Sequence, residues 1–224
     1  MKTGKLLLVV LAGLIPIIGT AGPVKFRIEV QPIGGVASPN AYLHLTKTVG
    51  FTTQTYELDG AGAYFGSLEV GVEIDTKIGF VDCLVGSGLL FMPVTAEGVE
   101  KSPGSGAFTT EVGYRFKLNR SGSVALGPFL GVVIPGDTTL ELEDDTGAGN
   151  DTDTFDFYGE GGGMAGVRFT AGGKHVSFAM KVGYMSWGYE VEPGDDQSWT
   201  VSYGGDDRLD MSGFFAQFGI SSQF

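Results

Sequence analysis

Cysteine and histidine are almost missing from this chain of 224 residues, which contains one Cys and two His. A single Cys forms no internal disulfide, and we interpret Cys83 as a small apolar residue rather than a reactive thiol. With two His, the chain has little capacity for acid–base or metal chemistry. Basic residues are few as well. There are 14 Lys and Arg against 26 Asp and Glu, and the net charge of −12 argues against a nucleic acid as partner.

Long apolar runs are confined to the start of the chain. Residues 6–18 are apolar, follow Lys2 and Lys5, and precede three small residues that end at Ala21. This pattern predicts a signal peptide, residues 1–21, cleaved after Ala21; an uncleaved membrane anchor is the alternative. Cleavage removes Lys2 and Lys5, changes the net charge from −12 to −14, and leaves residues 22–224 as one domain. Because that domain has no apolar stretch of 18 residues, we expect no membrane-spanning helix in it.

Glycine and apolar residues are plentiful, with 38 Gly and 42% hydrophobic residues. In the last stretch, residues 213–224, apolar side chains such as Phe214, Phe218 and Ile220 fall on every second position, and mostly small or polar residues lie between them. A period of two is produced by a β-strand whose two faces meet different surroundings. Such strands can hide their apolar face in lipid when they close into a barrel, because lipid tolerates no unpaired sheet edge.

The same alternation marks seven further stretches. It is clearest in residues 108–118, where Phe108, Val112 and Phe116 share one face while Glu111 and Arg115 share the other. The eight expected strands cover residues 24–31, 62–74, 78–91, 108–118, 123–133, 155–169, 176–184 and 213–224.

Two of these strands need a choice of register. In residues 78–91, Asp82 is expected inside, with Val81, Cys83, Val85, Leu89 and Phe91 outside. A slip of one residue would leave Asp82 in hydrocarbon. In residues 155–169, Phe155 and Phe157 are expected outside, with Tyr158 and Glu160 inside.

The connections alternate between short and long. Tight turns are expected at residues 75–77, 119–122 and 171–174, and long connections at residues 34–60, 93–106, 135–154 and 189–208. Short turns on one side and long loops on the other are typical of transmembrane β-barrels. A further hairpin at residues 41–58, which would give ten strands, is the alternative. Pro128 cannot donate to a strand ladder, so we expect irregular pairing there.

The end of the chain also resembles the assembly signal of outer-membrane β-barrel proteins. Gln217, Gly219 and Phe224 stand at matching positions, while Ser222 stands where the family usually has an aromatic residue. Over the whole mature chain, the eight stretches resemble the small barrels of the outer membrane protein A transmembrane domain and the opacity-type proteins.

This resemblance implies an all-β fold, an eight-stranded antiparallel up-and-down transmembrane β-barrel, in the outer membrane of a Gram-negative bacterium. It implies outer-membrane lipids, lipopolysaccharide and the β-barrel assembly machinery as partners of a monomer. The implied role is structural or surface interaction, without a cofactor or an enzymatic activity.

Inward positions of the expected strands carry charges of both signs. Eight strands close a barrel just wide enough for side chains to fill, and charges removed from water need partners. We therefore predict a neutralising network that plugs the lumen; a narrow, porin-like channel is the alternative. The expected lumen residues are six cations and six anions: Lys25, Arg27, Arg115, Lys117, Arg168 and Lys181 with Glu29, Glu69, Glu73, Asp82, Glu111 and Glu160.

Two further patterns offer other sites. The connection at residues 135–156 is dense in carboxylates, and its candidate Ca²⁺ ligands are Asp144, Asp145, Asp151 and Asp153. Their spacing does not reproduce an EF-hand, so we favour a flexible, solvated loop and keep the Ca²⁺ site as the alternative.

The pair His175 and Ser177 is similar to the His-x-Ser arrangement of outer-membrane lipid A deacylases. It is expected beside a periplasmic turn, away from the outer leaflet, so we expect no catalytic residue and keep a lipid A-modifying enzyme as the alternative. Trp187 is a candidate for one interfacial aromatic girdle, and Phe116, Phe178 and Phe224 are candidates for the opposite one.

Overall fold

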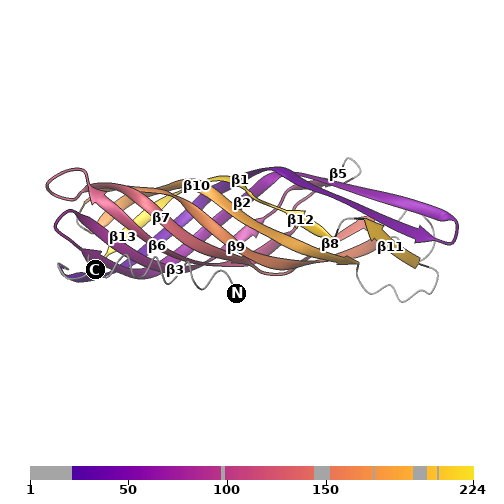
Figure 1. Cartoon of the computed structure of the whole chain (residues 1–224), viewed down its shortest axis with the longest axis horizontal. Helices are drawn as coiled ribbons and strands as arrows, with labels where there is room; N and C mark the ends of the chain where they lie inside the picture. Colours follow the sequence, from indigo (N-terminus) through magenta and orange to yellow (C-terminus); the bar gives the residue numbers. More distant parts are fainter. Residues whose placement is uncertain (1–21, 97–98, 144–151, 174, 194–200, 206) are drawn as a thin grey trace.

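Eight long strands form a closed antiparallel ring in the computed structural model, which describes residues 22–96, 99–143, 152–173, 175–193, 201–205 and 207–224. Consecutive long strands pair with one another, and the first pairs with the last, so the sheet closes on itself (Figure 1). The all-β, eight-stranded up-and-down barrel expected from the sequence is confirmed. The strands are β1 (Val24–Val49), β2 (Thr52–Asp75), β3 (Gly79–Phe91), β6 (Gly104–Lys117), β7 (Val124–Pro135), β9 (Thr152–Gly172), β10 (Val176–Pro193) and β13 (Gly213–Gln223).

Three tight turns join strands at one end of the barrel, which we call the turn end. They connect β2 to β3, β6 to β7 and β9 to β10, and the C-terminus lies at the same end (Figure 1). The first turn is held by Thr76, whose hydroxyl donates to the Gly79 carbonyl at 2.8 Å and accepts from the Gly79 amide at 3.0 Å. In the second, Gly122 has a φ of 70°, which favours glycine.

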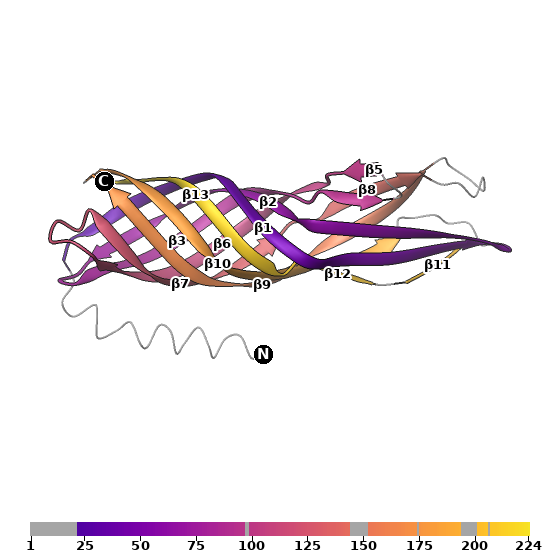
Figure 2. The same cartoon turned by 90° about the horizontal axis from the view of Figure 1, so that it is seen from above.

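The first hairpin corrects the expected connection at residues 34–60. Those residues are not a loop, because β1 and β2 continue through them as 26-residue and 24-residue strands. Val49 pairs with Thr52, and Gly50, with a φ of 62°, makes the tip together with Phe51. At roughly 3.3 Å per residue, β1 is about 85 Å long, so the hairpin projects far from the turn end (Figure 2). We call this the hairpin end.

Short strands widen the sheet at the hairpin end. They are β4 (Val94–Ala96), β5 (Val99–Lys101), β8 (Thr138–Glu143), β11 (Val201–Gly205) and β12 (Arg208–Asp210). β10 itself continues to Pro193, and β9 begins at Thr152, so parts of two further expected connections are strand as well. The hairpin at residues 41–58 extends β1 and β2 and adds no ninth or tenth strand to the ring.

The outside of the half next to the turn end is an apolar belt. In β3 the outward residues include Cys83, Val85, Leu89 and Phe91, while Asp82 is fully buried; Val81, expected outside, is covered to 3% exposure. The girdle candidates Phe116, Phe178 and Phe224 are exposed. The belt consists of Val24, Phe26, Val30, Ile33, Tyr64, Leu68, Val72, Val85, Leu89, Phe91, Phe108, Phe116, Leu126, Leu130, Val132, Ile134, Val167, Phe178, Val182, Tyr184, Phe214, Phe218 and Ile220.

In the half next to the hairpin end the polarity of the two faces is reversed. Apolar side chains point inward and form a core whose members include Leu43, Leu45, Tyr56, Leu58, Val94, Leu140, Leu142, Phe155, Phe157, Trp187, Tyr189, Val191, Leu209 and Met211. Carboxylates such as Glu57, Glu141 and Glu190 are exposed outside. This half is therefore a folded extension of the barrel with an apolar interior of its own. We call the cluster of buried apolar side chains the apolar core.

A bulge in β9 explains why the sequence misassigned this half. Ser186 pairs with Gly163, but Gly188 pairs with Glu160, so β9 has one extra residue in between. One extra residue moves every following side chain to the other face. Phe155 and Phe157, expected outside, are 1% and 2% exposed in the apolar core.

Two other expectations about side-chain direction are wrong, and one about strand pairing is confirmed. Tyr158, expected inside, is 42% exposed, and Trp187, expected in an interfacial girdle, is buried in the apolar core. At Pro128 the ladder is irregular as expected, since β6 and β7 pair at Gly113 with Phe129 and at Phe116 with Leu126 but not between. No helix in the described part of the chain could cross a membrane.

Candidate functional site: the charged lumen

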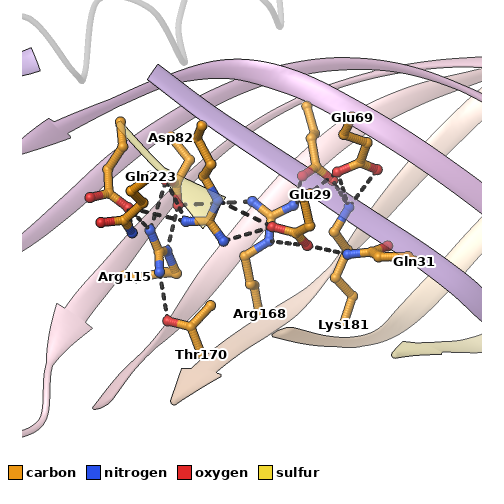
Figure 3. Close-up of polar contacts among 12 residues, drawn as sticks. Glu29, Gln31, Glu69, Asp82, Arg115, Arg168, Thr170, Lys181 and Gln223 are labelled. Carbon is orange, nitrogen blue, oxygen red and sulfur yellow. Dashed lines mark hydrogen bonds and ion pairs between the residues drawn. The ribbon is translucent and has the colours of Figure 1, made fainter. Parts of the chain in front are cut away.

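Inside the belt half, charged side chains from six strands meet in a buried network (Figure 3). Period-two alternation directs these residues inward while their apolar neighbours face out. Arg115 of β6 lies in the part of this buried network that is closer to the turn end. Its guanidinium donates to Asp82 of β3 at 2.6 and 2.8 Å and to the Thr170 hydroxyl of β9 at 2.6 Å, and it also contacts Glu73 of β2.

Arg27 of β1 links three carboxylates. Its guanidinium donates to Glu29 at 2.6 Å, Glu73 at 3.1 Å and Asp82 at 3.2 Å, and Arg27, Glu29, Glu73 and Asp82 have no exposed surface. Gln223, one residue before the C-terminus, also donates to Glu73 at 2.8 Å. Since each carboxylate has at least one cationic partner, the attraction offsets much of the cost of removing the charges from water.

Lys181 and Arg168 continue the network toward the hairpin end. The Lys181 ammonium lies 2.6 Å from both carboxylate oxygens of Glu69 and 2.9 Å from Glu111. Arg168 contacts Glu111, Glu69 and Glu29. Both cations face the ring of Phe129, with centroid distances of 5.6 Å for Arg168 and 5.8 Å for Lys181. Phe129 belongs to the apolar core, so the charged network and the core are in direct contact.

Of the twelve charges expected in the lumen, Glu160 is the exception. It lies on the outer surface, where it pairs with Arg208 at 2.9 Å, because the β9 bulge turns it outward. Asp75 instead supplies the sixth inward carboxylate, so that the inward cations and anions remain equal in number. It pairs with Lys117 at 2.5 Å at the turn end, where Lys25 also approaches Glu73 at 3.9 Å. Sequence reasoning missed Asp75 because it was assigned to a turn.

A second buried ionic contact lies in the half next to the hairpin end. Asp153, a candidate Ca²⁺ ligand by sequence, is an inward residue of β9, 5% exposed. Lys47 of β1 and the Tyr56 hydroxyl of β2 each donate to it at 2.5 Å. Tyr56 also packs edge-on against Phe155, with ring centroids 5.5 Å apart. Sequence reasoning missed this cluster because residues 34–60 were assigned to a loop.

No metal centre is formed by the described residues, among which no three His, Cys, Asp or Glu side chains are grouped to hold an ion. Asp144, Asp145 and Asp151 lie outside the described residues, as do the expected signal peptide and cleavage site. The apolar core also contains Tyr189, whose phenol shares a hydrogen bond of 3.1 Å with the Ser105 hydroxyl. Burial raises the pKa of the Tyr189 phenol.

The remaining expected residues lie around the turn end. His175 is exposed, whereas Ser177 is 9% exposed and lines a cavity of 280 Å³ with Lys25, Lys117 and Gln223. Gln217 is buried inside the barrel.

Gly219 faces β1 so closely that a Cβ would lie 1.9 Å from the Val30 carbonyl oxygen, which explains glycine at this position. Phe224 is exposed. The cavity extends to Arg115, where the network begins, and side chains of the network and the apolar core then fill the lumen.

These features define the class: a closed eight-stranded antiparallel β-barrel with an apolar belt outside and a filled lumen. No protein-family model matches the chain, and no curated protein matches it either. Among solved structures, it is similar to the β domain of the Bordetella autotransporter BrkA, with 15% identity over 89% of this chain and 98% of that one. The TM-score of 0.26 is too low for this likeness to support any argument about function.

Proposed function

We propose that the protein is a non-enzymatic β-barrel of the outer membrane of a Gram-negative bacterium, with a structural or surface-interaction role. The apolar belt on the outside of a closed barrel supports the membrane placement, because closure leaves no unpaired sheet edge in lipid. The partners are outer-membrane lipids, lipopolysaccharide and the β-barrel assembly machinery, and the protein is a monomer. The resemblance of Gln217, Gly219 and Phe224 to an assembly signal supports the same placement.

The lengths of the connections support one orientation, and the charged residues at the two ends of the barrel also differ. The described turns carry Lys77 and Arg120, whereas the outward carboxylates, such as Glu57, Glu141 and Glu190, lie in the half next to the hairpin end. Short turns in barrels of this class face the periplasm and long loops face outward. The hairpin end is therefore the extracellular end, and its acidic surface is the part that meets other molecules.

The filled lumen is the observation that carries a structural role rather than a channel. At most 2% of the surface is exposed in each of four lumen cations: Arg27, Arg115, Arg168 and Lys181. The apolar core follows them directly, on the side of the hairpin end. Single-channel recording of the purified mature protein in planar bilayers tests this role. We expect no steady conductance; a porin recorded in a separate bilayer of the same composition is the positive control. A large, steady conductance would replace the structural role with a channel.

A further inference from the structure

The outer wall of the barrel carries a groove of about 590 Å³ across β1, β2 and β3. Gly66 lies in its floor, and its rims include Ile33 of β1, Tyr64 of β2, and Leu89 and Phe91 of β3. Ile33, Tyr64 and Leu89 are 69%, 65% and 61% exposed, so these side chains stand out from the wall. No charged residue lines the groove.

The groove results from an interruption of the β1–β2 ladder. Gln31 pairs with Ser67 and Gly35 pairs with Tyr64, so three residues of β1 lie opposite two of β2. The three residues begin with Pro32, which has no amide hydrogen to donate. Gly66 adds to the depression, because it occupies an outward position between Tyr64 and Leu68 without a side chain.

The groove lies at the margin of the belt nearest the hairpin end. Tyr64 and Phe91, which pair with each other, belong to the belt, and further along β2 the outward residues are Asp59 and Glu57. Under the proposed orientation this margin faces the outer leaflet. An uncharged, concave surface at that depth meets hydrocarbon chains, and a chain that lies along the concavity gains van der Waals contacts with rims on both sides.

We propose that this groove holds one acyl chain of an outer-leaflet lipid, an inference that rests on the proposed function. The chain fills the space above Gly66 between the rims formed by Ile33, Tyr64 and Leu89. A Cβ at Gly66 would lie at ordinary contact distance, 3.4 Å from its nearest neighbour, the Pro32 carbonyl oxygen. A side chain can therefore begin at this position, and we expect Gly66→Leu to occupy the groove while the barrel still folds.

Photo-crosslinking tests the proposal. The mature protein is refolded into phosphatidylcholine vesicles containing a lipid with a diazirine on its acyl chain, and crosslinked residues are mapped by mass spectrometry. We expect crosslinks to concentrate on residues 32–34, 64–68 and 87–91. Gly66→Leu should reduce them by at least about fivefold, since losing roughly ten close carbon–carbon contacts is worth that much. Gly163→Leu is the matched control, because its Cβ position is also outward and open.

Each other outcome is decisive. Labelling spread evenly around the belt, or unchanged in Gly66→Leu, refutes the groove while leaving the membrane barrel intact. An absence of lipid crosslinks at these residues, together with disulfide-linked dimers of a Tyr64→Cys variant that also carries Cys83→Ala, would show that a second copy covers the groove, which also refutes the proposal. Failure of the wild-type protein to insert, seen as digestion of every strand by added protease, would instead overturn the proposed function.

Discussion

The charged residues in the lumen differ in the number of ionic partners that each one contacts. Arg27 donates to three carboxylates from three strands, which suits the planar fork of a guanidinium. Lys181 instead sits as a point charge between Glu69 and Glu111. Losing either cation leaves buried carboxylates without full compensation, which is more costly than losing an exposed pair.

Lys181→Met should therefore destabilise the barrel strongly. We expect a loss of about 3–5 kcal/mol in the free energy of unfolding, because Glu69 and Glu111 lose their ammonium partner in a buried site. The measurement is urea unfolding of the protein refolded in lipid vesicles. Adding Glu69→Gln to Lys181→Met should recover part of the loss, because one buried negative charge is removed.

The exposed pair of Arg208 and Glu160 gives the control for this prediction. Arg208→Met should cost no more than about 1 kcal/mol, because the pair is screened by water. Equal effects of Lys181→Met and Arg208→Met would show that the lumen network does not stabilise the barrel.

In β9, one extra residue reverses which side chains face the interior on the two sides of the bulge. On one side of the Gly159–Gly163 run, Met164 and Arg168 face inward; on the other, Phe155 and Phe157 do. Gly162 needs to be glycine, since a Cβ there would lie far too close to the Ser186 backbone. This run therefore lets one strand serve both the charged network and the apolar core.

Deleting Gly161 should prevent assembly. With the extra residue gone, either Phe155 and Phe157 turn outward into water or Arg168 turns outward into the belt. Circular dichroism and protease protection after refolding into vesicles report the result, and we expect neither strand signal nor protection. Gly161→Ala is the control, expected to change stability by no more than about 0.5 kcal/mol, because the position is exposed and roomy. A deletion variant that folds as well as the wild type contradicts this account of the bulge.

The contact of Lys47 and Tyr56 with Asp153 attaches the β1–β2 hairpin to β9. Asp153→Asn removes the charge that both donors share. We expect amide hydrogens of residues 42–58 to exchange about tenfold faster, as loss of a charged hydrogen bond implies, with exchange in the belt strands unchanged. Hydrogen–deuterium exchange with mass spectrometry measures both regions. Asp156→Asn, at an outward position of the same strand, should leave the hairpin unchanged.

The sequence predicts the belt half well and the other half poorly, for a physical reason. In the belt half, apolar side chains outside and charged side chains inside produce an alternation that can be assigned without ambiguity, as in β6. In the other half, water is outside and apolar residues are inside, so the same alternation has the opposite meaning. The alternation around Leu43 and Leu45 therefore did not indicate that β1 continues beyond the belt. The β9 bulge that turns Glu160 outward is visible only in the structure.

At the scale of the whole molecule, charge is segregated along the barrel. The outward carboxylates of the described residues all lie in the half next to the hairpin end: Glu57, Asp59, Glu100, Asp137, Glu141, Glu143, Asp156, Glu160, Glu190, Glu192, Asp207 and Asp210. Only Lys101 and Arg208 oppose them there among the described residues. The lumen charges, by contrast, are paired with one another. Repulsion between carboxylates therefore acts mainly on the half next to the hairpin end.

Salt should stabilise that half selectively. Raising the ionic strength from about 0.01 M to about 1 M shortens the Debye length from about 30 Å to about 3 Å and screens the repulsion. We expect slower hydrogen exchange in residues 138–143 and 186–193, and unchanged exchange in residues 108–117. Replacing Glu190 and Glu192 with Gln should shrink the response. An equal response in both halves would contradict the segregation of charge.

The pairing of β1 with β13 has a consequence for biogenesis. It joins Arg27 to Gln223, whereas every other long strand pairs with its neighbour in chain order. Hairpins between neighbours can form while the polypeptide is still emerging, but the seam cannot. Contacts so distant along the chain are slow to form, and until this one exists two strand edges lack partners that hydrocarbon cannot supply. For a barrel placed in a membrane as proposed, we therefore expect the cylinder to enter the bilayer as a closed unit, with the β1–β13 seam forming last.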